Sequence, residues 1–580
     1  METYVFIDVS RKQEYIYRNK SLRDNLINSY VIKAITEIPE YTEDRSQVGG
    51  SRVMLKTFLE KHFQGEYTVI YSGGGNSMLQ FNRAEHAKQF SRKYSLEVLR
   101  HYPEIELYIS KMIDQELPEE QLSAENSLGI TKRNMKVIRQ MLNQRADLLK
   151  DKRRAMFRRW SYGVEKIGEN GKPMEWLNKH NNEPEIASGA IAEENDQTLG
   201  KARRFLFGRL EERLREMDAN NNPVQITTKL EDYKARNDRK GYIGIIALDG
   251  NRMGEMFHSL NEIHEMKEFS STIEQIYADA VARALYHYAV RHNKTLQVTP
   301  VLMSGDDICL VTQAEDALNI TADILKQIQK LSLEREAGGV LDKAMNAGAT
   351  PHSAQQHYLT ACAGVAIVRV TYPFFDAIRI AEKLCHQAKE ALHHSTENEA
   401  TSASFIDWDI VQGQVSAQTA YEKRVARARK HEHFRIRPLR VDQEAGIVSG
   451  VYSYNAFRDL VAELHSIMNK KNSNELDVSS SFLEKIKKQL YNGWESYSLL
   501  FERDQTNSGA RLSQLVEKHF MQGYSSIDID SDRGWIRHQY GAIIESNTMA
   551  KYDEYRYVLN DVLETMAFVY GQEEVVHGKQ

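Results

Sequence analysis

The sequence predicts an α+β protein with two ferredoxin-like domains, each in the order strand, helix, two strands, helix, strand. Two observations lead to this fold class. Strand-like and helical patterns follow one another in that order from residue 3 to 109 and again from residue 242 to 393. In each half, a short polar turn interrupts an apolar run, which is typical of a β-hairpin. We expect the two ferredoxin-like domains at residues 1–115 and 239–415. A helical insert at residues 116–238 would lie between them, and a helical C-terminal domain would follow at residues 416–580.

The first repeat begins with a strand over residues 3–9, followed by a long helix with apolar residues at mostly helical spacing. A hairpin over residues 67–81 has a glycine-rich tip. A helix over 83–100 and a strand over 105–109 complete the repeat.

The second repeat has a strand that ends at Asp249, followed by the remaining elements in the same order. A helix over residues 269–291 and a hairpin over 298–312 come first. A helix over 314–331, a strand over 359–368 and a final helix over 373–393 follow. The two tips align as Ser72, Gly73, Gly74 and Gly75 with Ser304, Gly305, Asp306 and Asp307. Because the first tip has glycines in place of acids, we expect only the second domain to be catalytic. The first tip would offer bare backbone amides to a phosphate group.

Composition limits the class of protein. The chain has 580 residues, 41% hydrophobic and 27% charged, which is typical of globular proteins. Its formal net charge of −5 excludes general polyanion binding by the whole molecule. No apolar run is long enough to span a bilayer, and the N-terminus has no signal-peptide layout, so we expect a cytoplasmic protein that binds no membrane. Three cysteines in apolar contexts, Cys309, Cys362 and Cys385, are expected to be reduced core thiols.

Three basic segments leave two interpretations open. Residues 132–160 carry eleven basic and two acidic side chains, and residues 201–215 and 421–441 are also basic. These segments either bind RNA phosphates or form solvated helix faces beside acidic neighbours. Residues 168–196 are expected to form an irregular loop, and they contain no cysteines for a zinc site.

Three aspartates suggest a metal site. Asp306 and Asp307 are adjacent at a tight turn, where their charges repel and a divalent cation would remove the repulsion. Asp249 ends an apolar strand, so the strand and the hairpin together can place all three carboxylates at one sheet edge. Palm-type nucleotidyl transferases hold two metal ions about 4 Å apart in this way. The alternative is that Asp-Gly and Gly-Asp-Asp are ordinary turn sequences.

The combination of motifs resembles a known family. It comprises Asp-Gly-Asn-x-Met-Gly from Asp249, Gly-Asp-Asp at the hairpin tip, and Ala-Gly-Val-Ala-Ile before a helix with Ala-Glu-Lys and Ala-Lys. This set resembles the large palm-domain subunit of type III CRISPR interference complexes, and the first helix and Gly-Gly-Gly-Asn hairpin resemble that family's first palm domain. The resemblance covers roughly residues 1–440. It implies a synthetase that joins ATP into 3′–5′ linked cyclic oligoadenylates, related to GGDEF-type cyclases.

The sequence departs from that family at three places. Ser304 replaces the first glycine of the common Gly-Gly-Asp-Asp tetrad. No His-Asp dipeptide of an HD nuclease is present, so we expect no DNA-cutting activity. The paired zinc cysteines that many members carry between the palm domains are also missing.

The resemblance and the pattern together give a set of expected site residues. The catalytic residues are Asp249, Asp306 and Asp307, which with the Gly250 carbonyl would hold two Mg²⁺ or Mn²⁺ ions. Expected nucleotide-binding residues are Ser72, Gly73, Gly74, Gly75, Asn76, Gly250, Asn251, Arg252, Ser304, Gly305 and Lys389. Helix capping is the alternative for Asn251 and Arg252, a solvated helix face for Lys389, and a tight turn for the first hairpin.

Three functions are therefore considered. The first is a cyclic oligoadenylate synthetase of antiviral defence that uses ATP, with guide or target RNA and other CRISPR subunits as partners. The second is a non-catalytic RNA-binding scaffold in an RNA-guided complex. The third is another palm enzyme, a dinucleotide cyclase or a templated polymerase. The sequence indicates neither the base specificity nor the oligomeric state.

Overall fold

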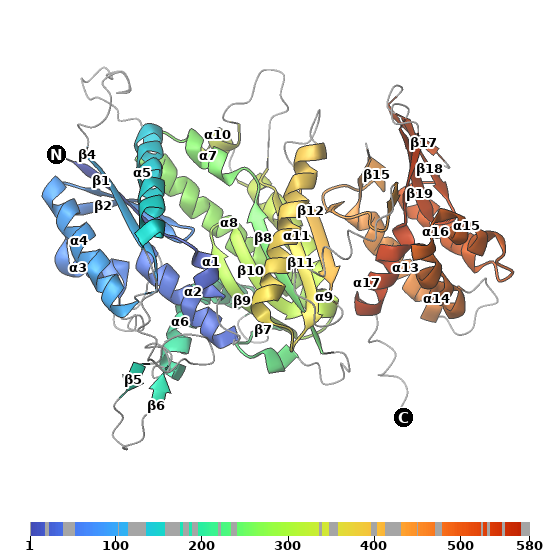
Figure 1. Cartoon of the computed structure of the whole chain (residues 1–580), viewed down its shortest axis with the longest axis horizontal. Helices are drawn as coiled ribbons and strands as arrows, with labels where there is room; N and C mark the ends of the chain where they lie inside the picture. Colours follow the sequence, from blue (N-terminus) through green and yellow to red (C-terminus); the bar gives the residue numbers. More distant parts are fainter. Residues whose placement is uncertain are drawn as a thin grey trace.

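The computed structural model describes most of the chain (Figure 1). The described residues are 2–17, 22–38, 53–102, 104–113, 135–156, 175–177, 185–187, 195–218, 222–233, 241–335, 339–346, 358–395, 403–411, 431–448, 450–469, 478–523, 526–530, 534–547 and 552–569. The mixed α+β class predicted from the sequence is confirmed: five sheets alternate with helices along this part of the chain.

The first palm domain contains a four-stranded antiparallel sheet in the order β2-β3-β1-β4. Its strands are β1 (Thr3–Val9), β2 (Tyr67–Gly73), β3 (Asn76–Phe81) and β4 (Leu107–Ile113). Its helices are α1 (Lys12–Ile16), α2 (Leu22–Thr36), α3 (Leu55–His62) and α4 (Ala84–His101). All seven residues of β1 are buried because both faces of the sheet are covered. Val5 and Ile7 pack with α2 and α4, whereas Tyr4 and Phe6 pack with the following helix, α5 (Met135–Met156).

The second palm domain has the same strand order within a wider sheet, β14-β12-β11-β8-β10-β9-β7. Its strands are β7 (Val224–Ile226), β8 (Tyr242–Gly250), β9 (Leu296–Ser304), β10 (Asp307–Gln313), β11 (Ala361–Arg369), β12 (Phe405–Ile410) and β14 (Leu439–Arg440). Its helices are α7 (Met253–Ser259), α8 (Ile263–Arg291), α9 (Ala314–Leu333), α10 (Val340–Met345) and α11 (Phe374–Ser395). Helices α8 and α9 cover one face and α11 the other. Gly364 allows α11 to lie close to β11, because a Cβ there would be 2.1 Å from the Ala381 carbonyl oxygen.

The two palm domains pack side by side (Figure 1). Helix α8 of the second domain contacts β2 of the first, and α2 of the first contacts β9 of the second. Helix α6 (Asn195–Met217) contacts both α2 and α8. This packing brings the tips of the β2–β3 and β9–β10 hairpins together.

The insert between the palm domains is not purely helical, so this part of the prediction needs correction. Besides α5 and α6 it contains a short hairpin, β5 (Glu175–Leu177) with β6 (Glu185–Ala187), inside the segment expected to be an irregular loop. Strand β7, followed by a 3₁₀ turn at Leu230–Tyr233, pairs with β9 and therefore extends the second sheet. Three-residue strands carry too little alternation to be recognised from sequence.

The C-terminal domain also differs from the helical domain that was predicted. Helices α13 (Tyr454–Asn469), α14 (Ser480–Gln489), α15 (Trp494–Glu502), α16 (Ser508–Phe520) and α17 (Val558–Val569) and a 3₁₀ turn (Leu490–Asn492) pack beside a five-stranded sheet. Its strands, in order across the sheet, are β13 (Glu432–His433), β20 (Tyr552–Arg556), β19 (Ala542–Asn547), β18 (Gly534–Gln539) and β17 (Ser526–Asp530), with a separate hairpin of β15 (Ile447–Val448) and β16 (Val451–Tyr452). The turn between β18 and β19 at Tyr540 and Gly541, with φ of 54° and 72°, was the sequence signal that was overlooked.

Two smaller expectations can be compared with the described residues. Cys309, Cys362 and Cys385 are buried and free, as predicted. None of the helices in the described part of the chain has the length and apolar character needed to cross a bilayer.

Candidate active site between two hairpins

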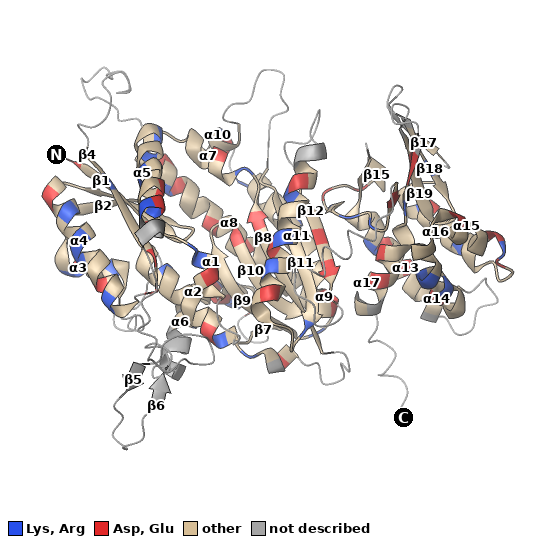
Figure 2. Cartoon of the chain, in the orientation of Figure 1, with Lys and Arg blue, Asp and Glu red and all other residues tan. Residues whose placement is uncertain are grey.

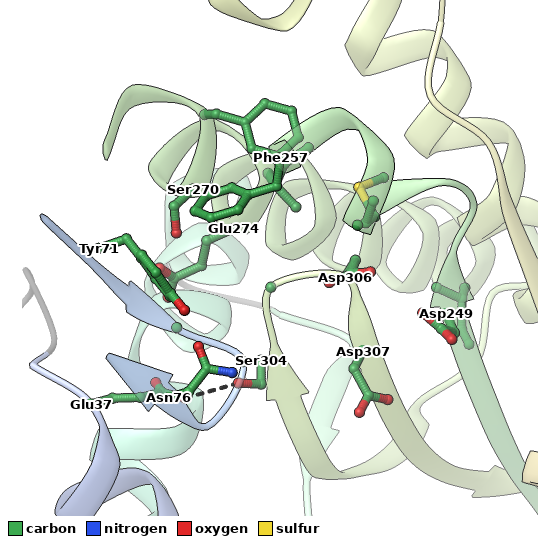
Figure 3. Close-up of a pocket in the computed structure, with 18 of the residues that line it drawn as sticks. Glu37, Tyr71, Asn76, Asp249, Phe257, Ser270, Glu274, Ser304, Asp306 and Asp307 are labelled. Carbon is green, nitrogen blue, oxygen red and sulfur yellow. Dashed lines mark hydrogen bonds between the residues drawn. The ribbon is translucent and has the colours of Figure 1, made fainter. Parts of the chain in front are cut away.

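A cavity of about 650 Å³ lies between the two palm domains and is lined by both hairpin tips (Figure 3). The second hairpin contributes Ser304, Gly305, Asp306 and Asp307, and the first contributes Gly73, Gly74 and Asn76. Asp249 from β8 and Lys389 from α11 also line it. Residues from both repeats, far apart in sequence, therefore meet around one space.

The second hairpin closes with a two-residue turn. Ser304 pairs with Asp307, so Gly305 and Asp306 form the turn between them. Gly305 has a φ of 64° and Asp306 has no positive φ, which is the pattern of a type II′ turn. Asp306 and Asp307 are consecutive, and Figure 3 shows them projecting to opposite sides of the hairpin.

Asp249 reaches the same edge of the sheet through the register of β8 and β10. Leu248 pairs with Ile308, so the next residue of β8, Asp249, lies beside the start of β10. Gly250 permits this close approach, because a Cβ there would be 2.9 Å from Cβ of Asp306 and 2.6 Å from the Tyr277 hydroxyl oxygen. The three aspartates thus converge at one end of the cavity.

Burial and mutual repulsion disfavour the charged forms of two of these acids. The pKa of Asp306 is raised to about 7 by burial and by the charge of Asp249. The pKa of Asp307 is raised to about 8 by burial and by the charges of Asp249, Asp306 and Glu382. Glu382, a cavity residue on α11 that sequence analysis missed, has its pKa raised to about 7 by burial. The cluster would therefore gain from a bound cation.

Lys389 supplies one positive charge to this cluster. Its Nζ lies 2.6 Å from Oδ2 of Asp249 and donates a 2.9 Å hydrogen bond to the Gly250 carbonyl oxygen. Burial lowers the pKa of Lys389, but the charge of Asp249 and the hydrogen bond to it outweigh burial, so the pKa is raised. Two of the predicted metal ligands, the Asp249 carboxylate and the Gly250 carbonyl oxygen, thus already contact a cationic group.

The residues fit a divalent metal in their chemistry. Among the described residues no three His, Cys, Asp or Glu side chains form a ready-made metal cluster. However, Asp249 and Gly250 offer oxygens to a cation, and Asp306 and Asp307 are carboxylates that burial leaves poorly compensated. The Tyr277 hydroxyl beside them is buried and has no hydrogen-bond partner within the described residues.

The two hairpins correspond, but with an alignment one residue later than the sequence suggested. Gly73 pairs with Asn76 across the first turn, just as Ser304 pairs with Asp307 across the second. Gly73, not Ser72, is therefore the counterpart of Ser304. Three consecutive glycines concealed which two form the turn, and the structure identifies them as Gly74 and Gly75, with φ of 64° and 73°.

The same register reveals a counterpart of the Asp249–Lys389 pair. Asp8 is the second-to-last residue of β1 and lies opposite Asn76, in the position that Asp249 occupies beside Asp307. Lys150, on the helix after the fourth strand, lies 2.9 Å from Oδ2 of Asp8. The sequence did contain a signal for Asp8, because β1 and β8 are both apolar strands with an acid as the second-to-last residue.

Two residues of the first hairpin have structural partners instead of facing the cavity. Ser72 Oγ accepts hydrogen bonds from the Ile38 amide at 2.6 Å and from Ser77 Oγ at 2.8 Å. The Gly75 amide donates to Glu37 Oε1 at 2.6 Å, so it is not a bare amide available to phosphate. Neither residue lines this cavity, although Gly75 lines a second, neighbouring one, so nucleotide binding by Ser72 and Gly75 stays a prediction. Gly73, Gly74 and Asn76 line the cavity as expected of a nucleotide contact.

Asn251 and Arg252 have hydrogen-bond partners within the protein, and their role in nucleotide binding stays a prediction. The Asn251 amide is buried and donates to Thr360 Oγ1 at 2.9 Å and to the Ala403 carbonyl at 3.0 Å, which ties β8 to the strands beside it. Arg252 donates to Glu255 Oε2 at 2.8 Å on the first turn of α7. Both side chains lie outside the lining of the cavity that the described residues form.

The end of the cavity away from Asp249 is aromatic, which sequence analysis did not predict (Figure 3). Tyr71 and Phe257 pack edge to face with their centroids 5.0 Å apart. The Arg139 guanidinium lies 4.4 Å from the Phe257 ring centroid and donates to the Phe257 carbonyl at 3.1 Å. An apolar wall with polar groups nearby, such as Ser270 and Glu274, suits a planar heterocycle.

Several of the described basic residues are engaged within the protein. In the insert, Arg145 donates to the Lys111 carbonyl at 2.6 Å and Arg213 to Asp279 at 2.8 Å. Near the second palm domain, Arg437 lies 3.0 Å from Asp561 in the interior. Figure 2 shows charges of both signs interleaved along α5 and α11. These pairs favour the solvated or packed interpretation, while residues 132–134, 157–160 and 421–430 of the basic segments lie outside the described residues.

Part of the chain matches a known protein family. The family model for the second palm domain of Cas10/Cmr2 matches residues 242–396. Among solved structures, the chain is similar to a Csm1–Csm4 cassette in complex with cA4, with 12% identity over 98% of this chain and 70% of that chain and a TM-score of 0.48. It is also similar to Csm1 of T. onnurineus, with 12% identity over 89% of this chain and 64% of that chain and a TM-score of 0.43. No curated protein matches the sequence.

Proposed function

We propose that the chain, whose residues 242–396 match the second palm domain of Cas10/Cmr2, belongs with the large palm-domain subunits of type III CRISPR complexes. We further propose that it is a nucleotidyl transferase that joins ATP into cyclic oligoadenylates. One observation carries the proposal. Asp249, Asp306 and Asp307 converge at one end of a cavity whose opposite wall is the glycine-rich hairpin of the first palm domain. A cavity shared by two similar domains suits a reaction between two similar molecules.

In the proposed reaction, two nucleotides bind across the cavity. The 3′-oxygen of one forms a bond to the α-phosphorus of the other, the bond between the α- and β-phosphates breaks, and pyrophosphate leaves with the hydroxyl proton passing to a nearby base. Asp249, Asp306, Asp307 and the Gly250 carbonyl would hold Mg²⁺ or Mn²⁺, which supplies charge neutralisation and activates the hydroxyl.

The protein's own groups have separate roles in this proposal. Lys389 lies beside Asp249 and is placed to bind triphosphate oxygens. The aromatic end, with Tyr71 and Phe257, would hold a base, while Gly73 and Gly74 allow phosphates to approach the first hairpin closely. A second cavity of about 580 Å³ is lined by Gly74 and by Asp8, Lys12 and Lys150, and it would accept part of the second nucleotide.

The biological setting is part of the same proposal. The family suggests antiviral defence, with other CRISPR subunits and guide or target RNA as partners. We propose ATP as the substrate in place of the other nucleoside triphosphates, because the family resemblance implies it.

Product analysis tests the function. Purified protein is incubated with Mg²⁺ or Mn²⁺ and each of the four nucleoside triphosphates, with and without a primer and RNA, and the products are identified by mass spectrometry. We expect cyclic adenylate products. Primer extension would show a templated polymerase, cyclic dinucleotides would show another cyclase, and tight RNA binding without turnover would support the scaffold.

A further inference from the structure

The carboxylate of Glu37 joins the two hairpin tips. Glu37 follows α2 in the first palm domain and its side chain is buried. Its Oε1 accepts a hydrogen bond of 2.6 Å from the Gly75 amide of the first hairpin. It also accepts one of 3.0 Å from Ser304 Oγ of the second hairpin (Figure 3). One oxygen atom therefore bonds both tips, although 267 residues separate Glu37 from Ser304.

Lys33, one helical turn earlier, strengthens the same link. Its ammonium lies 3.7 Å from Glu37 Oε2 and donates a 3.1 Å hydrogen bond to the Met303 carbonyl, next to Ser304. The end of α2 is itself fixed to the first hairpin, because the Ile38 amide donates to Ser72 Oγ. This short segment therefore holds the first hairpin on one side and the end of β9 on the other.

Ser304 stands where the first hairpin has Gly73, and a glycine has no hydroxyl to offer. We propose that Glu37 and Ser304 form a clamp across the two palm domains that sets the distance between the hairpins, and so the alignment of the two nucleotides. The inference rests on the proposed function. In that reaction a 3′-oxygen and an α-phosphorus held on different domains must meet, and a shift of about 1 Å between reacting atoms costs on the order of a hundredfold in rate. Glu37 and Ser304 are positioning residues, since they act through the hairpins that they hold.

The clamp is tested with Ser304→Ala, which removes the donor, and Glu37→Ala, which removes the acceptor. Both variants are expected to lower kcat for joining ATP about tenfold or more, while KM for ATP changes less than about threefold, because binding groups remain but alignment is lost. Glu37→Gln keeps an oxygen that can accept from Gly75 and Ser304, so it should retain most of the wild-type kcat.

A matched control separates alignment from loss of packing. Ser332 is another buried serine of the second palm domain, whose hydroxyl donates to the Gln329 carbonyl at 2.8 Å and accepts from the Leu359 amide at 2.9 Å. Ser332→Ala should lower the unfolding temperature about as much as Ser304→Ala but leave kcat near the wild-type value. A fall in kcat of the same size in both variants would overturn the clamp.

Hydrogen–deuterium exchange provides a readout that needs no activity. Ser304→Ala changes the second palm domain, yet we expect faster amide exchange over residues 72–78 of the first domain, since Glu37 loses one of its anchors. Ser332→Ala should leave that exchange unchanged. Unchanged exchange in Ser304→Ala, or a change in KM without a change in kcat, would refute the clamp. If wild-type protein made no product from ATP, the proposed function would fail while the exchange experiment still decided whether the clamp exists.

Discussion

The ammonium group of Lys389 lies 2.6 Å from Oδ2 of Asp249, so this carboxylate has a cationic partner without any bound metal. The same ammonium donates to the Gly250 carbonyl. A metal ion that binds Asp249 must therefore displace Lys389 or share the carboxylate with it. When a nucleotide binds, the released lysine would be free to contact the triphosphate.

This competition predicts the effect of Lys389→Met. Removing the ammonium should raise the affinity of nucleotide-free protein for Mn²⁺ about tenfold, since Asp249 loses its competing cation. The same variant should lose about tenfold or more in kcat/KM for ATP, since the triphosphate loses a contact. Mn²⁺ binding is measured by electron paramagnetic resonance of the free ion. Lys383→Met, at an exposed position on the same helix, is the control, and equal Mn²⁺ affinity in Lys389→Met and wild type would contradict the competition.

The half-buried carboxyl groups of Asp306 and Asp307 predict how the stability of the protein depends on pH. The folded-state pKa of Asp306 is about 7 and that of Asp307 about 8, both above their ordinary values. Between pH 4 and 8 the folded protein therefore binds more protons than the unfolded chain, so without metal the free energy of unfolding should fall as the pH rises through this range. Asp307→Asn removes one of the two groups that cause this fall in the free energy of unfolding. Without metal, the variant should therefore be more stable than wild type at pH 8 by roughly 1–3 kcal/mol.

Urea unfolding in EDTA at pH 5 and pH 8 measures this difference. Wild type should be less stable at pH 8, and added Mg²⁺ should restore stability there because a cation compensates the charged carboxylates. A free energy of unfolding that rises from pH 5 to pH 8 in EDTA would show that the two acids are not protonated in the folded protein.

The sequence was sufficient to predict elements whose signal is local. Asp249 at the end of an apolar strand and the Ser304–Asp307 turn were recognisable, because strand periodicity and turn chemistry appear within a few residues. The role of Glu37 was not predictable, because no local pattern shows which side chain will face a hairpin 267 residues away. The partners of Asn251 were not predictable for a related reason: its position after the metal acid suggested a ligand contact, whereas its hydrogen-bond acceptors, Thr360 and Ala403, come from segments much later in the chain.

The internal correspondence of the palm domains predicts unequal effects at two equivalent positions. Asp249→Asn should abolish product formation, as should the double variant of Asp306→Asn with Asp307→Asn, since the metal-binding oxygens are lost. Asp8→Asn should cost less than about tenfold, since the first hairpin has Gly75 and Asn76 at the positions of Asp306 and Asp307. Product is quantified by mass spectrometry, and circular dichroism shows that each variant is folded. Equal loss in Asp8→Asn and Asp249→Asn would contradict a single catalytic domain.

The hydrogen bonds of Asn251 predict a change in stability without a change in substrate affinity. Its amide donates to Thr360 and Ala403 in the interior, so Asn251→Ala should destabilise the protein by about 1–3 kcal/mol, because both acceptors lose a buried partner. KM for ATP should stay within about twofold of wild type, and the same holds for Arg252→Ala, whose guanidinium pairs with Glu255. Thermal unfolding and steady-state kinetics on the two variants measure the two quantities separately. A large rise in the KM for ATP of Asn251→Ala, with an unchanged free energy of unfolding, would show that Asn251 contributes to nucleotide binding.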